Sequence, residues 1–296
     1  MATPSAPAAL GSRTRLRPPA SADQILKLTR YQFREYLSSR RYVALVGIVA
    51  AIGVIITAIV AHFRGGLVSD PLAFYGTFWG GAAFVVIILA AVFFGGDAIA
   101  GEFQNKTGYF LMGLPIRRAT VYVGKFIAAL AASVSILLLY LIILLLNGAY
   151  YFGGSALPWQ LGPSVILAVV YLTAVLGTTF MFSSLFKTSA YGFVLTAILF
   201  LFGFAILEAL VQGLVKTEPW MVISYASSAI GEVFAPSINW GLAGTVTTIV
   251  TPTGPGQSVT TVVYTAGVAE GVVIMLAYFV ITAVAGLALF EREEFS

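Results

Sequence analysis

The chain has 296 residues, of which 59% are hydrophobic and only 9% charged, and its mean hydropathy is +0.95. Because a soluble domain carries about 25% charged residues, this composition excludes a water-soluble protein and predicts an integral membrane protein. The net charge is only +4, and the sequence has no cysteine and one histidine, which excludes disulfides, thiolate metal sites and His-pair metal centres.

The N-terminal region divides into a tail and a helix. Residues 1–20 are rich in Ala, Pro, Ser and Arg without an apolar core, which predicts a disordered cytosolic tail and not a signal peptide. In residues 21–41, Ser21 and Gln24 fit a capping box, and apolar residues recur at helical spacing between basic ones. This pattern predicts an amphipathic helix along the inner membrane face. It serves either as a positive anchor or as an anchor that also contacts a cytosolic partner, through Lys27, Arg30, Phe33 and Arg34.

Six segments are long and apolar enough to cross the hydrocarbon core of a bilayer, which takes about 20 residues. They predict one all-α transmembrane domain over residues 42–296, with spans at about 42–62, 74–96, 126–147, 164–186, 190–212 and 267–290.

The distribution of cations predicts the orientation of these spans. If the N-terminus is cytosolic, only Arg64 and Lys216 of the 16 Lys and Arg residues fall outside. Because cytosolic loops are enriched in Lys and Arg, we expect a multi-pass protein of the plasma membrane with both termini in the cytosol.

The stretch GGDAIAGEFQNKTGYFLMGLPIRR, residues 95–118, interrupts the apolar sequence. Pro115 suits the first turn of a helix, so we expect the third span's helix to begin near it, whereas the last charge before the apolar core is Lys125. Ten residues give about 15 Å of helix beyond the hydrocarbon. The second span runs past Asp97 towards Glu102, so a short element over about 103–113 should reach the cytosol.

The short element is unusual for a solvent-facing loop because most of its large residues are apolar. They are Phe103, Tyr109, Phe110, Leu111, Met112 and Leu114. Such side chains either pack back on neighbouring helices or occupy a partner's groove, since aromatic residues and Met are enriched in interface cores.

The two carboxylates at the start of this stretch do not form an acid–base pair. Asp97 and Glu102 are five residues apart, about 140° round a helix. We expect Asp97 to form a hydrogen bond at the membrane boundary and Glu102 to pair with Lys106 or Arg117. Glu102 also qualifies as the residue that fixes the loop geometry.

Two further carboxylates, Glu208 and Glu270, lie in apolar spans near their external ends. They either mark the membrane boundary or contribute to a translocation path or dimer seam.

Residues 213–266 contain TVTTIVTPTGPGQSVTTVV, in which Pro and Gly leave each half too short to cross. We expect an external loop of short helices or a re-entrant hairpin there, with a seventh span as the alternative.

The loop after the second span resembles the permease subunits of ABC-2 type ABC transporters, most of all the branch labelled as involved in multicopper-enzyme maturation. The matching residues are Glu102, Thr107, Gly108, Leu111, Leu114, Pro115, Arg117, Arg118, Gly124, Lys125 and Phe126. The resemblance also includes the basic helix before the first span, the six spans and the long last external loop.

This resemblance implies an ATP-driven transporter subunit, an exporter, that pairs with a second copy or a related permease. Two cytosolic ABC ATPase subunits would hold ATP and Mg and receive the loop between spans two and three as a coupling helix, and the N-terminal helix would contact them too. No GxxxxGK[ST] loop occurs here, so we expect any ATP hydrolysis to happen on another chain. The chain itself is expected to be no enzyme and to bind no cofactor, metal or nucleic acid. The Thr- and Gly-rich last loop departs from the family's short external helices. A secondary transporter and a non-transporting anchor or assembly subunit are the alternatives.

Overall fold

The computed structural model describes residues 21–62, 70–104, 117–154, 157–186, 188–254 and 257–292. Within these residues, six helical stretches are long and apolar enough to cross a membrane. In chain order they are span 1 (Arg40–His62), span 2 (Pro71–Glu102), span 3 (Arg118–Phe152), span 4 (Leu161–Leu185), span 5 (Ser189–Val215) and span 6 (Val268–Arg292). The prediction of a helical membrane protein with six transmembrane helices is confirmed.

Four spans are single helices, and two are interrupted. The single helices are α2 (Arg40–His62), α7 (Arg118–Phe152), α8 (Leu161–Leu185) and α12 (Val268–Arg292). Span 2 consists of α3 (Pro71–Tyr75), the π-helical turn η1 (Gly76–Gly80), α4 (Ala83–Gly95) and the start of α5 (Ala100–Gln104). Span 5 consists of α9 (Ser189–Ile198), η2 (Leu199–Gly203), α10 (Phe204–Leu210) and η3 (Val211–Val215), where η2 and η3 are also π-helical.

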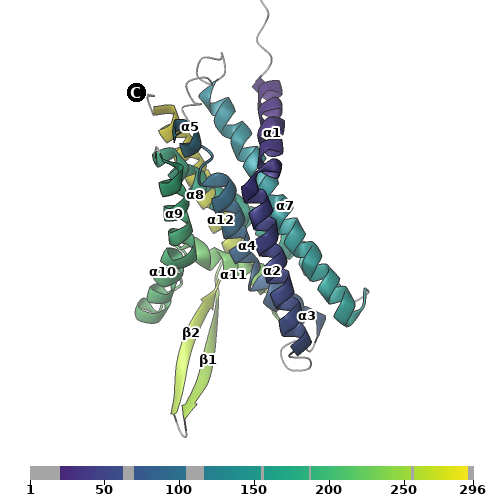
Figure 1. Cartoon of the computed structure of the whole chain (residues 1–296). Helices are drawn as coiled ribbons and strands as arrows, with labels where there is room; N and C mark the ends of the chain where they lie inside the picture. The colour runs from purple at the N-terminus through teal and green to yellow at the C-terminus, as the bar shows by residue number, and fades with distance from the viewer. Residues whose placement is uncertain are drawn as a thin grey trace, which may run out of the picture.

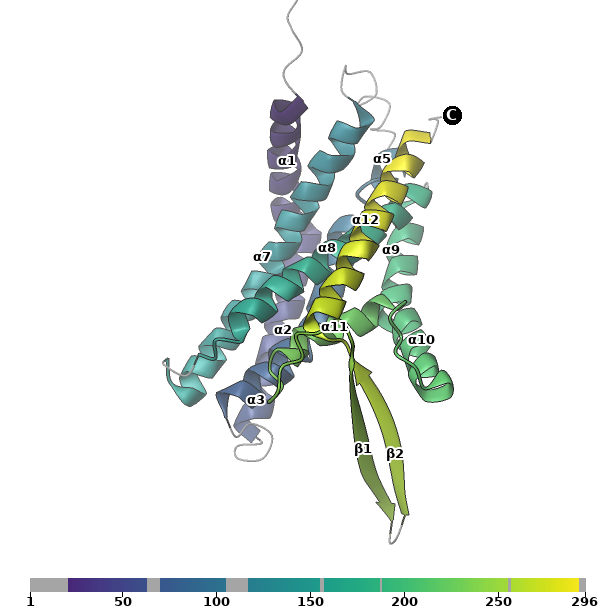
Figure 2. The same cartoon turned by 180° about the vertical axis from the view of Figure 1, so that it is seen from behind.

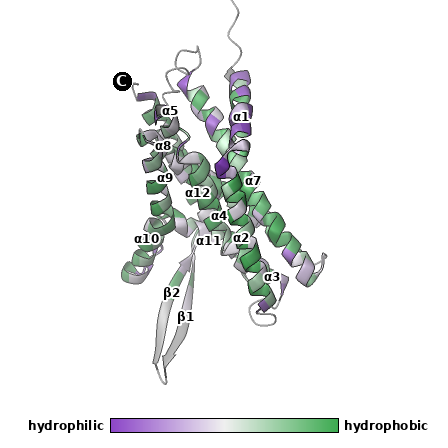
Figure 3. Ribbon diagram, in the orientation of Figure 1, coloured by the Kyte–Doolittle hydropathy of each residue, from purple (hydrophilic) through white to green (hydrophobic). Residues whose placement is uncertain are grey.

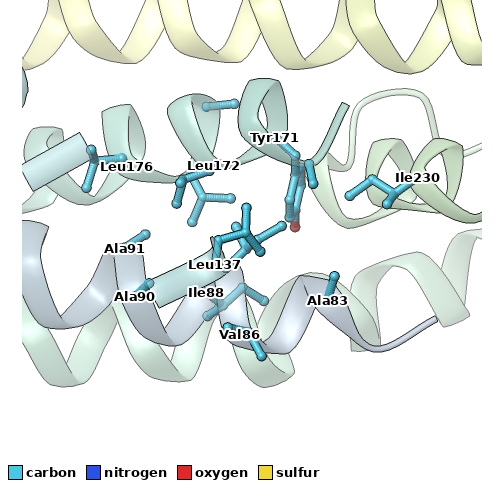
Figure 4. Packing of buried hydrophobic residues seen from close by; sticks show 14 of the residues in the cluster. Ala83, Val86, Ile88, Ala90, Ala91, Leu137, Tyr171, Leu172, Leu176 and Ile230 are labelled. Carbon is cyan, nitrogen blue, oxygen red and sulfur yellow. The ribbon is translucent and has the colours of Figure 1, made fainter. Parts of the chain in front are cut away.

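The core of the bundle lies between α4 and α8. In the apolar stretches of spans 2 and 4, 67% and 61% of the residues are buried inside the protein. Ala90 and Ala91 of α4 are fully buried, and a Cβ added to Gly95 would lie 2.9 Å from a methyl of Leu176, so the two helices approach closely. Figure 4 shows Ala91 on the side of α4 that faces Leu172 and Leu176. Small residues at a helix contact are typical of membrane bundles, where close packing stabilises association.

Both described ends of the chain lie at the same end of the bundle (Figures 1 and 2). Polar residues concentrate there on α1 (Ser21–Ser38) and at the start of α7, whereas the spans are largely hydrophobic (Figure 3). Trp159, Trp220 and Trp240 lie in the connections at the opposite end and are exposed. Exposed Trp is typical of a membrane–water boundary.

The region between spans 5 and 6 corrects one prediction. It contains a single described helix, α11 (Ile223–Glu232), followed by an antiparallel hairpin of β1 (Thr245–Gly254) and β2 (Gln257–Thr265). The hairpin projects away from the bundle (Figures 1 and 2), so it is not a re-entrant hairpin packed on the bundle, whereas α11 agrees with the predicted short helices. The reason is local: TVTTIVT consists of β-branched residues, which favour extended backbone.

Helix α7 is the longest single helix among the described residues, and it supports α1. Its 35 residues correspond to about 52 Å, longer than the roughly 30 Å hydrocarbon core. It begins at Arg118, three residues after Pro115, because Arg117 is extended. The apolar face of α1 packs on α7 through Leu28, and the Thr29 hydroxyl donates to the carbonyl oxygen of Gly124 at 3.1 Å. Whether its basic face lies on the membrane surface stays a prediction.

Candidate functional site

The short helix α5 stands at the base of the loop between spans 2 and 3, and neighbouring helices hold its start. Ser183 of α8 is fully buried, and its hydroxyl oxygen accepts hydrogen bonds from the backbone N–H groups of Ile99 at 3.0 Å and Ala100 at 3.1 Å. The first N–H groups of a helix have no partner within it. A serine from span 4 therefore acts as the cap of α5.

A buried ion pair joins α5 to span 3. Lys125 Nζ lies 2.5 Å from Glu102 Oε1 and donates to the carbonyl oxygen of Ala98 at 2.8 Å. Lys125 is 4% exposed, so both bonds form away from solvent. The sequence predicted Lys106 or Arg117 as the cation for Glu102; Lys106 lies outside the described residues, and the structure adds Lys125 as a cation for Glu102. Lys125 lies near the start of α7, and its long side chain reaches both Glu102 of α5 and the Ala98 carbonyl oxygen just before α5.

A second ion pair joins the turn before α5 to span 1. The Asp97 carboxylate pairs with Arg41 in the first turn of α2. Nearby, the Tyr36 hydroxyl of α1 donates to the carbonyl oxygen of Phe94 at 3.2 Å, and the two rings meet edge to face. Burial raises the pKa of Tyr36 well above its ordinary value, which keeps it a neutral donor. The predicted boundary role of Asp97 thus includes an ion pair with the start of span 1.

The fourth connection of α5 is to span 5. Gln104 Oε1 accepts from the backbone N–H of Ser189 at 2.9 Å and from its hydroxyl at 2.6 Å. Just before α5, Gly96 packs against span 5 so closely that a Cβ on Gly192 would lie 2.6 Å from the Gly96 carbonyl oxygen. The segment 96–104 therefore contacts spans 1, 3, 4 and 5; we call it the α5 joint.

Only part of the predicted loop surface can be placed. Thr107, Gly108, Tyr109, Phe110, Leu111, Leu114 and Pro115 lie outside the described residues, and Phe103 lies in α5 without a described side chain. Arg117 is exposed in front of α7, whereas Arg118 donates to the carbonyl oxygen of Glu291 at 2.8 Å, near the end of α12. Arg118 thus ties the return of the loop to span 6.

The predicted contact residues of α1 divide between its two faces. Lys27, Arg30 and Arg34 are exposed, while Phe33 is half-buried on the side that packs against the bundle. The exposed side also presents Leu26 and Tyr31. A basic face with two large apolar side chains is thus exposed at the same end of the bundle as the α5 joint (Figure 1).

The two intramembrane glutamates lie at the opposite end of the bundle, away from the α5 joint. Glu270 is buried in the first turn of α12, where its carboxylate accepts from the N–H of Gly267 at 3.2 Å and from the Tyr225 hydroxyl at 3.3 Å. An acidic residue at the third helical position that reaches back to the cap residue is half of a capping box. The bonds of Glu270 therefore serve the start of span 6.

Glu208 has a different environment. It is half-buried in α10, accepts a hydrogen bond from the Ser224 hydroxyl of α11, and accepts another from Gln212 at 3.1 Å. Both partners are neutral, and the two ion pairs found among the described residues do not include it. The structure does not bring Glu208 and Glu270 into contact with one another.

The described residues include no group of three His, Asp or Glu side chains that could hold a metal ion. In the comparison with protein families, the model described as "ABC-2 family transporter protein" matches residues 20–295. No curated protein matches the chain at a significant level.

Proposed function

The chain belongs to the ABC-2 family of transporter membrane proteins, and on that premise we propose that it is the permease of an ATP-driven exporter. As a permease it is the membrane component of the transporter and not itself catalytic, and the family implies association with ABC ATPase subunits. The further parts of the proposal are that two such subunits bind ATP and Mg on the cytosolic side, and that a second permease completes the pore.

The observation that carries the proposal is the α5 joint. A loop that receives force from an ATPase needs a base that is fixed to the helices it moves. The α5 joint is bonded to span 1 through Asp97, to span 3 through Glu102, to span 4 through Ser183 and to span 5 through Gln104. Movement of the loop at 105–116 would therefore reach four spans directly.

The charge distribution supports a cytosolic position for this end. Exposed Lys27, Arg30 and Arg34 lie at the same end as the α5 joint, whereas the exposed Trp residues and the hairpin lie at the other end. Because Lys and Arg are retained on the cytosolic side, we propose that both termini face the cytosol of a cell whose plasma membrane contains the transporter.

Of the two intramembrane acids, we propose only Glu208 for the translocation path. The bonds of Glu270 are accounted for by the start of α12 and by Tyr225. Glu208 has neutral partners from α11 and from its own helix, and it remains half-exposed. Carboxylates within a membrane usually face an aqueous path or a bundle interior, which favours Glu208 as the pathway residue.

The test of the proposal is copurification of an ATPase with a tagged chain. Leu111→Asp and Leu114→Asp place a charge on the predicted contact surface and should abolish recovery of a Walker-motif ATPase while membrane insertion is unchanged. Leu242→Asp is the matched control, because Leu242 is exposed near the hairpin at the other end and its variant should retain the ATPase. Normal ATPase recovery with both loop variants would show that the loop is not the contact.

A further inference from the structure

Span 5 differs from the other spans in how little of it the bundle encloses. Only 11% of its apolar stretch is buried, against 67% for span 2. Its exposed residues include Phe202, Ile206 and Leu210, whereas Phe200 and Thr196 are buried. Two of its four segments, η2 and η3, are π-helical turns, which are uncommon and often mark functional positions. Span 5 is therefore the span that can shift with the smallest loss of internal packing.

The first turn of span 5, which lies nearest the α5 joint, is capped by a residue from outside the span. The cap position, Thr188, makes no side-chain hydrogen bond to the helix. The N–H of Ser189 donates instead to Gln104 of α5. The first turn of span 5 thus takes its cap from α5, so the position of α5 sets the position of this turn. The Gly96–Gly192 approach presses the same two segments together.

The far end of span 5 is also hydrogen-bonded to elements outside it. Gln212 donates to the carbonyl oxygen of Tyr264 at 3.4 Å and accepts from the Tyr264 N–H at 3.3 Å. Its side-chain amide therefore pairs with the edge of β2 as a neighbouring strand would. The Tyr264 hydroxyl donates to the carbonyl oxygen of Lys216 at 2.7 Å. The Glu208 carboxylate accepts a hydrogen bond from the Ser224 hydroxyl of α11. Span 5 is fixed at both ends and thinly packed between them.

We propose that span 5 relays the position of the coupling loop to the opposite side of the membrane, and that Gln104 is the positioning residue that attaches α5 to it. The proposal rests on the proposed function, since the displacement originates in an ATPase bound to the loop. When α5 moves, the capped first turn of span 5 moves with it. The Gln212–Tyr264 pairing then carries the shift to the hairpin, and the Glu208–Ser224 contact carries it to α11.

The chemistry of the Gln104 contact provides a discriminating pair of variants. Gln104 uses only its oxygen here, as the acceptor for two donors of Ser189. A glutamate at this position retains both bonds and adds a negative charge that a helix N-terminus favours. A methionine has similar length but no comparable acceptor. Gln104→Glu should therefore preserve the connection and Gln104→Met should break it, although both alter the same position.

The absence of cysteine allows spin labels at chosen sites without background. We would label Leu214→Cys at the far end of span 5 and Tyr150→Cys near the end of α7, both of which are 77% exposed in the native chain. In the complex with its ATPase in nanodiscs, adenylyl imidodiphosphate should shift the distance between the labels by about 2–5 Å. Gln104→Met should lose this shift while the ATPase still copurifies and hydrolyses ATP, and Gln104→Glu should retain it.

Three outcomes would overturn the inference. The Gln104→Met complex could shift as the native chain does, Gln104→Glu could lose the shift as methionine does, or Gln104→Met could lose the ATPase itself. The last result would place Gln104 in the ATPase contact and not in the relay. Failure of the proposed function looks different, because no ATPase would then copurify with the chain carrying native Gln104.

Discussion

Lys125 and Glu102 form an ion pair in which Nζ lies 2.5 Å from Oε1, although Lys125 is only 4% exposed. The same ammonium group donates a hydrogen bond to the carbonyl oxygen of Ala98. A buried charge is stable only with a partner and further hydrogen bonds, and this one has both. The pair thus fixes α5 on span 3 at the base of the loop between spans 2 and 3.

Removing one member of this pair should destabilise the folded chain. Lys125→Met leaves the Glu102 carboxylate without this cation, and we expect a loss of about 3 kcal/mol in the free energy of unfolding, measured by denaturation of the purified chain in detergent. The double variant Lys125→Met/Glu102→Gln should recover most of the loss, since the carboxylate charge that lost this cation is removed as well. Equal stability of the single variant and the native chain would contradict the buried pair.

The contact between Gly96 and Gly192 makes a second prediction. A Cβ on Gly192 would lie 2.6 Å from the Gly96 carbonyl oxygen, so Gly192→Ala must push span 5 away from the α5 joint. We expect a loss of about 1–3 kcal/mol in the same unfolding measurement. Gly47→Ala is the control: nothing lies within 4 Å of the added Cβ, and alanine is the better helix former. If Gly192→Ala left the free energy of unfolding unchanged, this close approach of Gly96 and Gly192 would be contradicted.

The sequence was sufficient to predict the spans because a membrane helix must be apolar over its own length, which is a local property. The α5 joint was only half predictable. Asp97 and Glu102 stood out as charges, but their partners Arg41 and Lys125 are 56 and 23 residues away, and only packing decides such pairs. The contacts of Ser183 and Gln104 could not be predicted from the sequence, since neutral polar residues at helix ends are common.

The hairpin was missed for a different reason. The Pro and Gly residues between its halves predict a loop, and the lack of charge from 233 to 269 is the reason for the alternative of a seventh span. The overlooked signal was the run of β-branched residues on both sides, which pair from Thr245 with Thr265 to Gly254 with Gln257. β-propensity of this strength should have outweighed the turn residues as an indication of two strands.

The base of the hairpin should respond to pH through Glu232 of α11. Burial raises the pKa of the Glu232 carboxyl above its ordinary value, and the carboxyl lies 3.4 Å from the Thr265 hydroxyl. The folded state then binds its proton more tightly than the unfolded state does, so the contribution to stability is present at low pH and is lost as pH rises through the raised pKa.

Hydrogen exchange at the N–H of Ala266, measured from pH 4 to 7 and corrected for intrinsic rates, should show greater opening at the higher pH. Glu232→Gln should remove that dependence, and an unchanged pH profile in this variant would refute the assignment.

Glu270 and Glu208 should respond differently to loss of the carboxylate, which separates a structural acid from a pathway candidate. Glu270→Ala removes the acceptor of the Gly267 N–H and of the Tyr225 hydroxyl, so we expect a loss of about 1–2 kcal/mol in unfolding free energy. Glu270→Gln keeps an oxygen at the same place and should lose much less. Glu208→Gln also keeps an acceptor for Ser224 and should unfold as the native chain does.

The decisive comparison is between the two glutamine variants in the intact transporter. Both preserve an oxygen acceptor and remove one negative charge, so they differ only in where that charge lies. If Glu208 lines the path, Glu208→Gln should alter transport by the assembled complex at unchanged stability, whereas Glu270→Gln should transport normally. Equal transport by the two variants would assign Glu208, like Glu270, to holding α11 and the ends of spans 5 and 6 together.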